Sequence, residues 1–166
     1  MILMATIDLR GCDVVGTISG NSPEIREYPE AASQDFKLGD FVYLVNGKVT
    51  VCGADPSSIL GIALKDATET EDSSIPVALA NRDTLFEANI YYDANGSDES
   101  NNALAAADIG KKYGIVKSAA GKWYIDKTDT SNTRIIIRDK VDDIGDYYAR
   151  VIFQVMVKNF QLDAVS

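Results

Sequence analysis

With 166 residues, 46% of them hydrophobic, the chain is long enough to bury the core of one globular domain and too apolar for wholesale disorder. Its formal net charge of −9 disfavours nucleic acid and membrane surfaces as partners, because both bind through clustered lysines and arginines. The chain has no histidine, the commonest general base and metal ligand, and no phosphate-binding loop, so we expect no enzyme, cofactor or metal.

The first 24 residues have no clean period and mix glycines with short apolar pairs. Two interpretations fit this segment. It is either an extended N-terminal arm ordered by a partner, with one short strand near Val14 to Ile18, or an ordinary first strand with loose ends. Under the first interpretation, Val14, Val15 and Ile18 are candidate partner contacts. The opening residues carry no basic segment before an apolar one, so we expect neither a signal peptide nor a membrane span.

The strongest local signal is a β-hairpin. Residues 40–45 and 48–52 are rich in β-branched and aromatic side chains, and Asn46-Gly47 between them favours a type I′ turn. The stretch Phe41–Val45 is apolar at every position, so both of its faces should be covered. The second face of this strand could be covered by another sheet, by the arm or by another subunit.

A third strand is expected at 59–64, where large residues share one face and Gly61 and Ala63 share the other. Small residues there allow either a close approach of another backbone or a tight bend of a barrel. The next strand, 75–79, contains Pro76, which predicts an edge strand or a strand start.

Alternation of apolar and polar residues predicts a clean strand from Thr84 to Tyr92, followed by a polar surface loop at 93–102. The alanine-rich stretch 103–107 is the only credible helix. A second hairpin spans 111–117 and 122–126, and further strands are expected at 134–138 and from Tyr147 to about Lys158, the longest of all.

About ten short strands joined mostly by hairpin-length turns predict an all-β fold, a small β-barrel or β-sandwich with one short helix. We assign residues 1–24 to the arm, 25–160 to a single β domain and 161–166 to a frayed tail. Cys12 and Cys52 have no metal-binding or redox spacing and should be reduced, buried thiols of a protein made in a reducing compartment.

Two clusters could carry chemistry. The acidic turn formed by Asp139, Asp142, Asp143 and Asp146 could hold calcium but lacks the spacing of a known calcium loop, which favours a solvated turn. Aromatic residues on strands could stack on sugars, contact a protein or belong to the core. These candidates are Tyr91, Tyr92, Trp123 and Tyr124.

Several segments resemble a known protein family in their order along the chain and in the kinds of residue they contain. They are residues 31–44 (AASQDFKLGDFVYL) running into 47–50 (GKVT), 59–64 (ILGIAL), 75–80 (IPVALA), 108–116 (DIGKKYGIV), 123–130 (WYIDKTDT) and 145–153 (GDYYARVIF). Over about residues 25–158 the chain resembles tailed-phage capsid decoration (cement) proteins and related small virion structural proteins. The resemblance implies a small β-barrel or tulip-like domain, often trimeric, and no catalytic residues. It also implies a protein made in the host cytoplasm that binds the major capsid protein on the outer lattice and reinforces it.

Two rival functions remain at this stage. A carbohydrate- or receptor-binding β-module of a virion or tail would need the four aromatic candidates to form an exposed platform. A hydrolase would need two carboxyl groups that face each other in a cleft.

Overall fold

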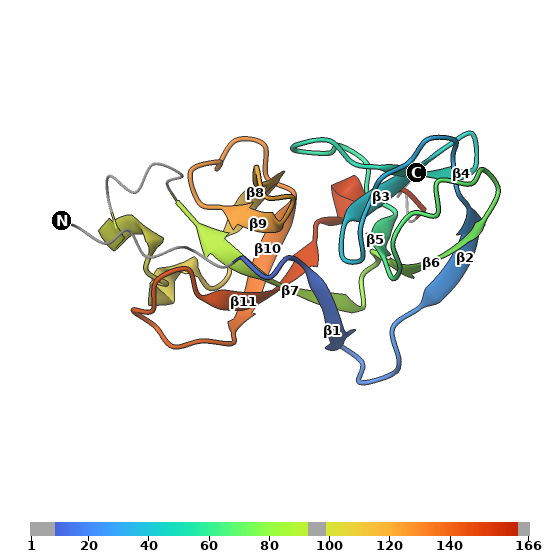
Figure 1. Ribbon diagram of the computed structural model, residues 1–166. Helices are drawn as coiled ribbons and strands as arrows, with labels where there is room; N and C mark the ends of the chain where they lie inside the picture. The colour runs from blue at the N-terminus through green and yellow to red at the C-terminus, as the bar shows by residue number, and fades with distance from the viewer. Residues whose placement is uncertain (1–8, 93–98, 163–166) are drawn as a thin grey trace.

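The computed structural model describes residues 9–92 and 99–162, and these form two β-sheets that lie side by side (Figure 1). The strand order is β1-β7-β11-β10-β8-β9 in the first sheet and β2-β6-β5-β3-β4 in the second. The strands are β1 (Asp13–Thr17), β2 (Ile25–Pro29), β3 (Phe41–Val45), β4 (Lys48–Val51), β5 (Gly61–Ala63), β6 (Ser74–Leu79), β7 (Thr84–Tyr91), β8 (Lys112–Lys117), β9 (Trp123–Asp126), β10 (Ile135–Lys140) and β11 (Arg150–Val155). Three short 3₁₀ turns complete the elements: η1 (Glu99–Asn102), η2 (Ala106–Asp108) and η3 (Val157–Asn159).

The first sheet closes into a barrel through β7. One edge of β7 pairs with β11. Its other edge pairs with β1 near the start of the strand, and in parallel with β9 near the end, where Ile90 lies opposite Ile125. The ring β7-β11-β10-β8-β9 is therefore a closed five-stranded barrel, with β1 added outside it. The predicted all-β fold with a small barrel is confirmed.

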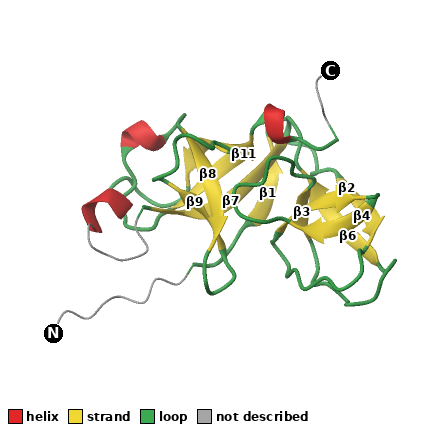
Figure 2. Ribbon diagram, turned by 90° about the horizontal axis from the view of Figure 1, so that it is seen from above, coloured by secondary structure: helices red, strands yellow, loops and turns green. Residues whose placement is uncertain are grey.

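The second sheet curls around a core of its own. A parallel bridge between Glu30 and Val49 brings the end of β2 towards β4, the strand at the opposite edge. The apolar side chains enclosed there are Phe36, Val42, Val49, Leu60, Ala63, Ile75, Val77 and Leu79. A larger core lies in the barrel and against the second sheet, and Figure 2 shows β3 on the side of the second sheet that faces the barrel strands.

Strand β3 contributes to both cores. The Phe41 ring packs edge-on against Trp123 of the barrel core, with 5.1 Å between ring centroids, while Val42 is enclosed in the second core. The prediction that both faces of 41–45 are covered is confirmed for these two residues. The second face of the strand is covered by the other sheet of the same chain, so no second subunit is needed to bury its apolar side chains.

Local chemistry explains the turns around this strand. Asn46 and Gly47 have φ values of 50° and 78°, as the predicted type I′ turn requires. A Cβ atom on Gly61 would lie 1.9 Å from the carbonyl oxygen of Ala78 in β6, so the glycine permits a close approach of two backbones. The large residues of the segment 59–64 were expected to share one face of the strand. Instead, Leu60 packs in the second core and Ile62 in the first.

Several predicted elements differ in the structure. The described residues contain no α-helix, and the alanine stretch 103–107 instead forms a bridge at Ala103 and enters η2. The N-cap of η2 is Ala105, which has no side-chain oxygen to stabilise a longer helix. Within residues 9–92 and 99–162, no helical turn is long and apolar enough to cross a membrane. The predicted loop at 93–102 lies outside the described residues up to 98.

Strand β6 is not an edge strand, because it lies between β2 and β5. The Pro76 carbonyl accepts a hydrogen bond from the Leu64 N–H at 2.9 Å, just beyond the end of β5. The N–H that proline lacks would point to the same side, where β5 has already ended. The longest strand is β7, with eight residues against six for β11.

The start of the predicted tail is ordered. The Gln161 side chain accepts a hydrogen bond from the Leu44 N–H at 2.6 Å and donates one to the Leu44 carbonyl at 2.8 Å. The amide therefore pairs with β3 as another strand would. Residues 163–166 lie outside the described part of the chain.

Candidate functional site

The outer edge of the first sheet carries exposed apolar side chains. Strand β1 is the end strand, and its register with β7 shifts between Val14 and Gly16, so that Val15 is the extra residue of a β-bulge. Val15 is 43% exposed and Ile18 57% exposed, and Ile25 at the start of β2 is also exposed. Val14 instead packs against the barrel core. We call Val15 and Ile18 the apolar edge.

A buried arginine holds β1 in place. Arg150 of β11 is 1% exposed, and it reaches across β7 to β1. Its guanidinium donates to the carboxylates of Glu87 and Asp13, to the Asn89 side-chain oxygen at 2.8 Å and to the Gly11 carbonyl at 3.0 Å. Strand β1 matches the short strand expected near Val14 to Ile18, which both interpretations of residues 1–24 include, and its described contacts lie within the chain. Residues 1–8 lie outside the described part.

The four aromatic candidates do not form an open platform. Trp123 is enclosed in the barrel core. Tyr91 is buried and packs edge-on against Tyr124, with ring centroids 4.9 Å apart, and burial raises the pKa of the Tyr124 hydroxyl to about 12. Tyr92 is half-buried, and its backbone N–H donates to Asn102. Neither the Trp123 ring nor the Tyr91 ring is therefore exposed as a face on which a sugar could stack, against the expectation for a carbohydrate-binding face.

Two carboxyl groups meet over Gly114 in β8. A Cβ atom on this glycine would lie 2.6 Å from Asp129 Oδ2 and 2.8 Å from Asp55 Oδ1. Burial, followed by the negative charge of Asp129, raises the pKa of Asp55. Burial acts in the same direction on Asp129, but the Asn132 and Ser131 N–H groups outweigh it and hold the pKa of Asp129 below its usual range. Asp55 is therefore the member of the pair that holds a proton more readily.

This pair predicts a stabilising substitution. A carboxyl group whose pKa is raised by folding contributes most below its unfolded pKa of about 3.9 and loses that contribution as the pH rises through the folded value. At pH 7 the charged pair is therefore unfavourable. We expect Asp55→Asn, whose amide can donate to Asp129, to stabilise the protein by about 1 kcal/mol at pH 7 and by less at pH 4.

Thermal unfolding of both proteins at the two pH values measures this difference. Asp139→Asn is the control, because the exposed Asp139 carboxylate accepts only the N–H of its neighbour Lys140. A lower melting temperature for Asp55→Asn than for wild type at pH 7 would show that the two carboxylates do not repel each other.

Carboxylates of the acidic turn accept hydrogen bonds from backbone N–H groups of the same chain. Asp142 accepts the Arg150 N–H at 2.8 Å, and Asp146 accepts the Asp143 N–H at 3.0 Å. Among the described residues, no three metal-binding side chains gather at one point. Cys12 and Cys52 are free and buried as predicted, and burial raises the pKa of Cys52 to about 12 and that of Cys12 well above its ordinary value.

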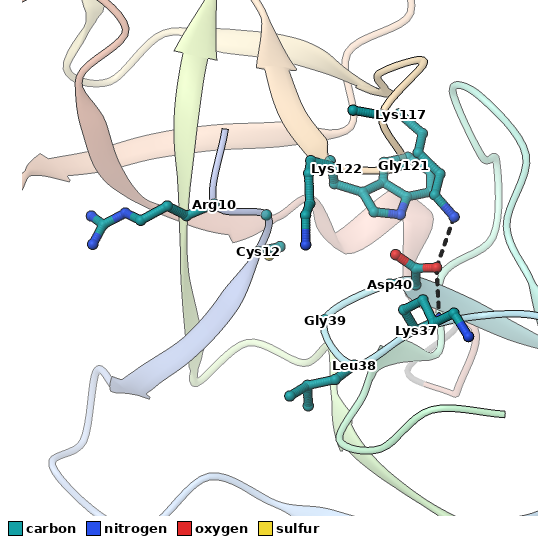
Figure 3. Close-up of a pocket in the computed structure, with 12 residues that line it drawn as sticks. Arg10, Cys12, Lys37, Leu38, Gly39, Asp40, Lys117, Gly121 and Lys122 are labelled. Atoms are coloured by element: carbon teal, nitrogen blue, oxygen red, sulfur yellow. Dashed lines mark hydrogen bonds and ion pairs between the residues drawn. The ribbon is translucent and has the colours of Figure 1, made fainter. Parts of the chain in front are cut away.

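A basic cavity of about 280 Å³ lies where the two sheets meet (Figure 3). Three segments line it: residues 10–12 ahead of β1, the loop 37–40 ahead of β3, and part of the β8–β9 hairpin between 117 and 123. Its cationic side chains are Arg10, Lys37, Lys117 and Lys122. Because the segments are far apart in the chain, nothing in the sequence pattern pointed to this cavity. We call it the basic cavity.

An ion pair forms one side of the basic cavity. The buried carboxylate of Asp40 accepts hydrogen bonds from Lys117 Nζ at 2.7 Å and from the Lys37 backbone N–H at 3.0 Å (Figure 3). Gly39 has a φ of +88°, and a Cβ atom there would lie 2.5 Å from the Cys12 carbonyl oxygen. The glycine therefore lets the loop ahead of β3 touch the segment that leads into β1.

Comparison with known proteins finds no protein-family model that matches the chain and no curated protein that matches it significantly. The candidate sites therefore rest on the geometry described above.

Proposed function

We propose that the chain is a non-enzymatic phage virion protein that binds the outer surface of the capsid and stabilises its lattice. The observation that carries the proposal is the apolar edge, two exposed apolar side chains on and just after the end strand of the first sheet. The resemblance of residues 25–158 to capsid decoration proteins names the partner, the major capsid protein.

The structure suggests how such docking would be favourable. Fully burying a valine or isoleucine side chain contributes about 1.5–3 kcal/mol. Arg150 already fixes β1, so docking would cost little further conformational entropy. The bulge at Val15 disrupts regular strand pairing at this edge, which favours docking by side chains over strand addition. A protein that binds only the assembled lattice stabilises that lattice by mass action.

The trimeric state is also part of the proposal, and it rests on the resemblance alone. The apolar strand β3, which first suggested a second subunit, is covered within the chain by the two cores. Light scattering on the purified protein measures its mass directly, and a monomer at the concentrations used for shell binding would remove the trimer from the proposal.

Co-sedimentation with shells assembled from the matching capsid protein tests the docking surface. We expect Val15→Glu and Ile18→Glu each to weaken binding about tenfold or more, because each places a charge in an apolar contact. Val141→Glu is the matched control, since Val141 is 45% exposed against 43% for Val15 but lies in the turn between β10 and β11.

All three variants should melt close to wild type. If wild type does not sediment with the shells, the decoration function is wrong. If wild type binds and the three variants bind equally well, the apolar edge is not the docking surface.

A further inference from the structure

The basic cavity contains a buried hydrogen-bond donor without an acceptor. Trp123 lines the cavity, is 1% exposed, and its indole Nε1–H has no hydrogen-bond partner in the described part of the protein. Leaving such a donor unsatisfied is unfavourable, and most buried donors in native proteins do have an acceptor. An acceptor atom supplied by a ligand in the cavity would satisfy it.

Among the described residues, neither Lys122 nor Arg10 of the basic cavity makes an ion pair, and of these two only Lys122 extends into the cavity. Lys117 is paired with Asp40, and Lys37 Nζ lies 4.0 Å from Asp66 Oδ2. Lys122 makes no ion pair with any residue that the structure describes. Figure 3 shows the Lys122 side chain extending beside Cys12, while the Arg10 guanidinium turns away from the cavity.

From this arrangement we infer that the basic cavity binds a carboxylate group of a ligand. A carboxylate carries one negative charge and two acceptor oxygens, which match one unpaired ammonium and one unpaired indole N–H. A phosphate dianion would bring a second charge close to the Asp40 carboxylate, while Arg10, the other cation without an ion pair among the described residues, turns its guanidinium away from the cavity. A cationic ligand would meet the ammonium groups of Lys117 and Lys122. This inference does not depend on the capsid-binding proposal.

The protein carries its own reporter for this site, because Trp123 is its only tryptophan. We expect acetate and glutarate to change the tryptophan fluorescence along a saturable curve at constant ionic strength. Chloride at the same ionic strength should produce no saturable change. Inorganic phosphate should bind at least tenfold more weakly than glutarate.

Lys122→Ala should weaken carboxylate binding about tenfold or more, and Lys122→Arg should restore most of it because the charge is kept. Lys112→Ala is the matched control, since Lys112 is exposed at the far end of the same hairpin, where β8 begins. Lys112→Ala should bind as wild type does. Calorimetric titration of the same variants checks affinity without relying on the fluorescence of Trp123.

A short glutamate peptide separates the two sources of the carboxylate. Binding of acetate or glutarate supports a small-molecule ligand, and binding of the peptide alone supports an acidic side chain of a protein. The inference is overturned if no carboxylate gives a saturable change, if chloride or phosphate binds as tightly, or if Lys122→Ala binds as well as Lys112→Ala. Shell co-sedimentation uses a different surface, so its failure would not affect these titrations.

Discussion

Replacing Arg150 with alanine is expected to lower the free energy of unfolding by about 3–5 kcal/mol, because it removes a buried guanidinium that bonds to several acceptors at once. The guanidinium is buried and bonded to two carboxylates, a side-chain amide and two backbone carbonyls. These partners lie on β7, on β1 and just ahead of β1, so the loss acts on the attachment of the end strand to the barrel. Arg150→Lys should show an intermediate loss, since lysine keeps the charge but not the planar fork.

Chemical denaturation measures the loss in stability, and amide hydrogen exchange along β1 shows where it acts. Arg26→Ala is the control, because the Arg26 pair with Glu24 is exposed and should contribute less than about 1 kcal/mol. Faster exchange in β1 than in β10 would locate the effect at the sheet edge. Equal stability of Arg150→Ala and Arg26→Ala would show that the buried network does not hold β1.

Local patterns predicted most of the strands. Alternation located β7, the short connection at 118–121 located the β8–β9 hairpin, and Asn46-Gly47 located the β3–β4 hairpin, because these signals depend on neighbours in the chain. Gly61 allowed either a close backbone approach or a tight bend, and the structure shows the close approach. The alanine stretch 103–107 failed as a helix because intrinsic propensity over five residues is weaker than the contacts that surround them.

The candidate sites depend on pairing that no local pattern contains. Arg150 lies in β11, and the acceptors that hold it come from β1 and β7, strands more than 50 residues away in the chain. Likewise, Asp40, Lys122 and Trp123 line one cavity although more than 80 residues separate the first from the other two. Registers between distant strands decide such contacts, and a single sequence does not reveal them.

The substitution Val42→Asp is expected to lower the free energy of unfolding by about 3–5 kcal/mol, because it places a charge without a partner in the second core. Val42 is fully enclosed there, among side chains of the second sheet. In a protein of this size the loss corresponds to a fall in melting temperature of about 10 °C or more. Because β3 also supplies Phe41 to the barrel core, we expect both cores to loosen together in one transition.

Val45→Asp is the matched control, since Val45 belongs to the same strand but is 41% exposed beside the Asn46-Gly47 turn. It should cost less than about 1 kcal/mol, the span of strand propensities. Near-UV circular dichroism follows Trp123 in the barrel core, and far-UV circular dichroism follows both sheets. Coincident unfolding curves for Val42→Asp would support β3 as the strand that couples the two cores. A mutant in which the tryptophan signal melts at the wild-type temperature would show that the barrel is stable without the second sheet.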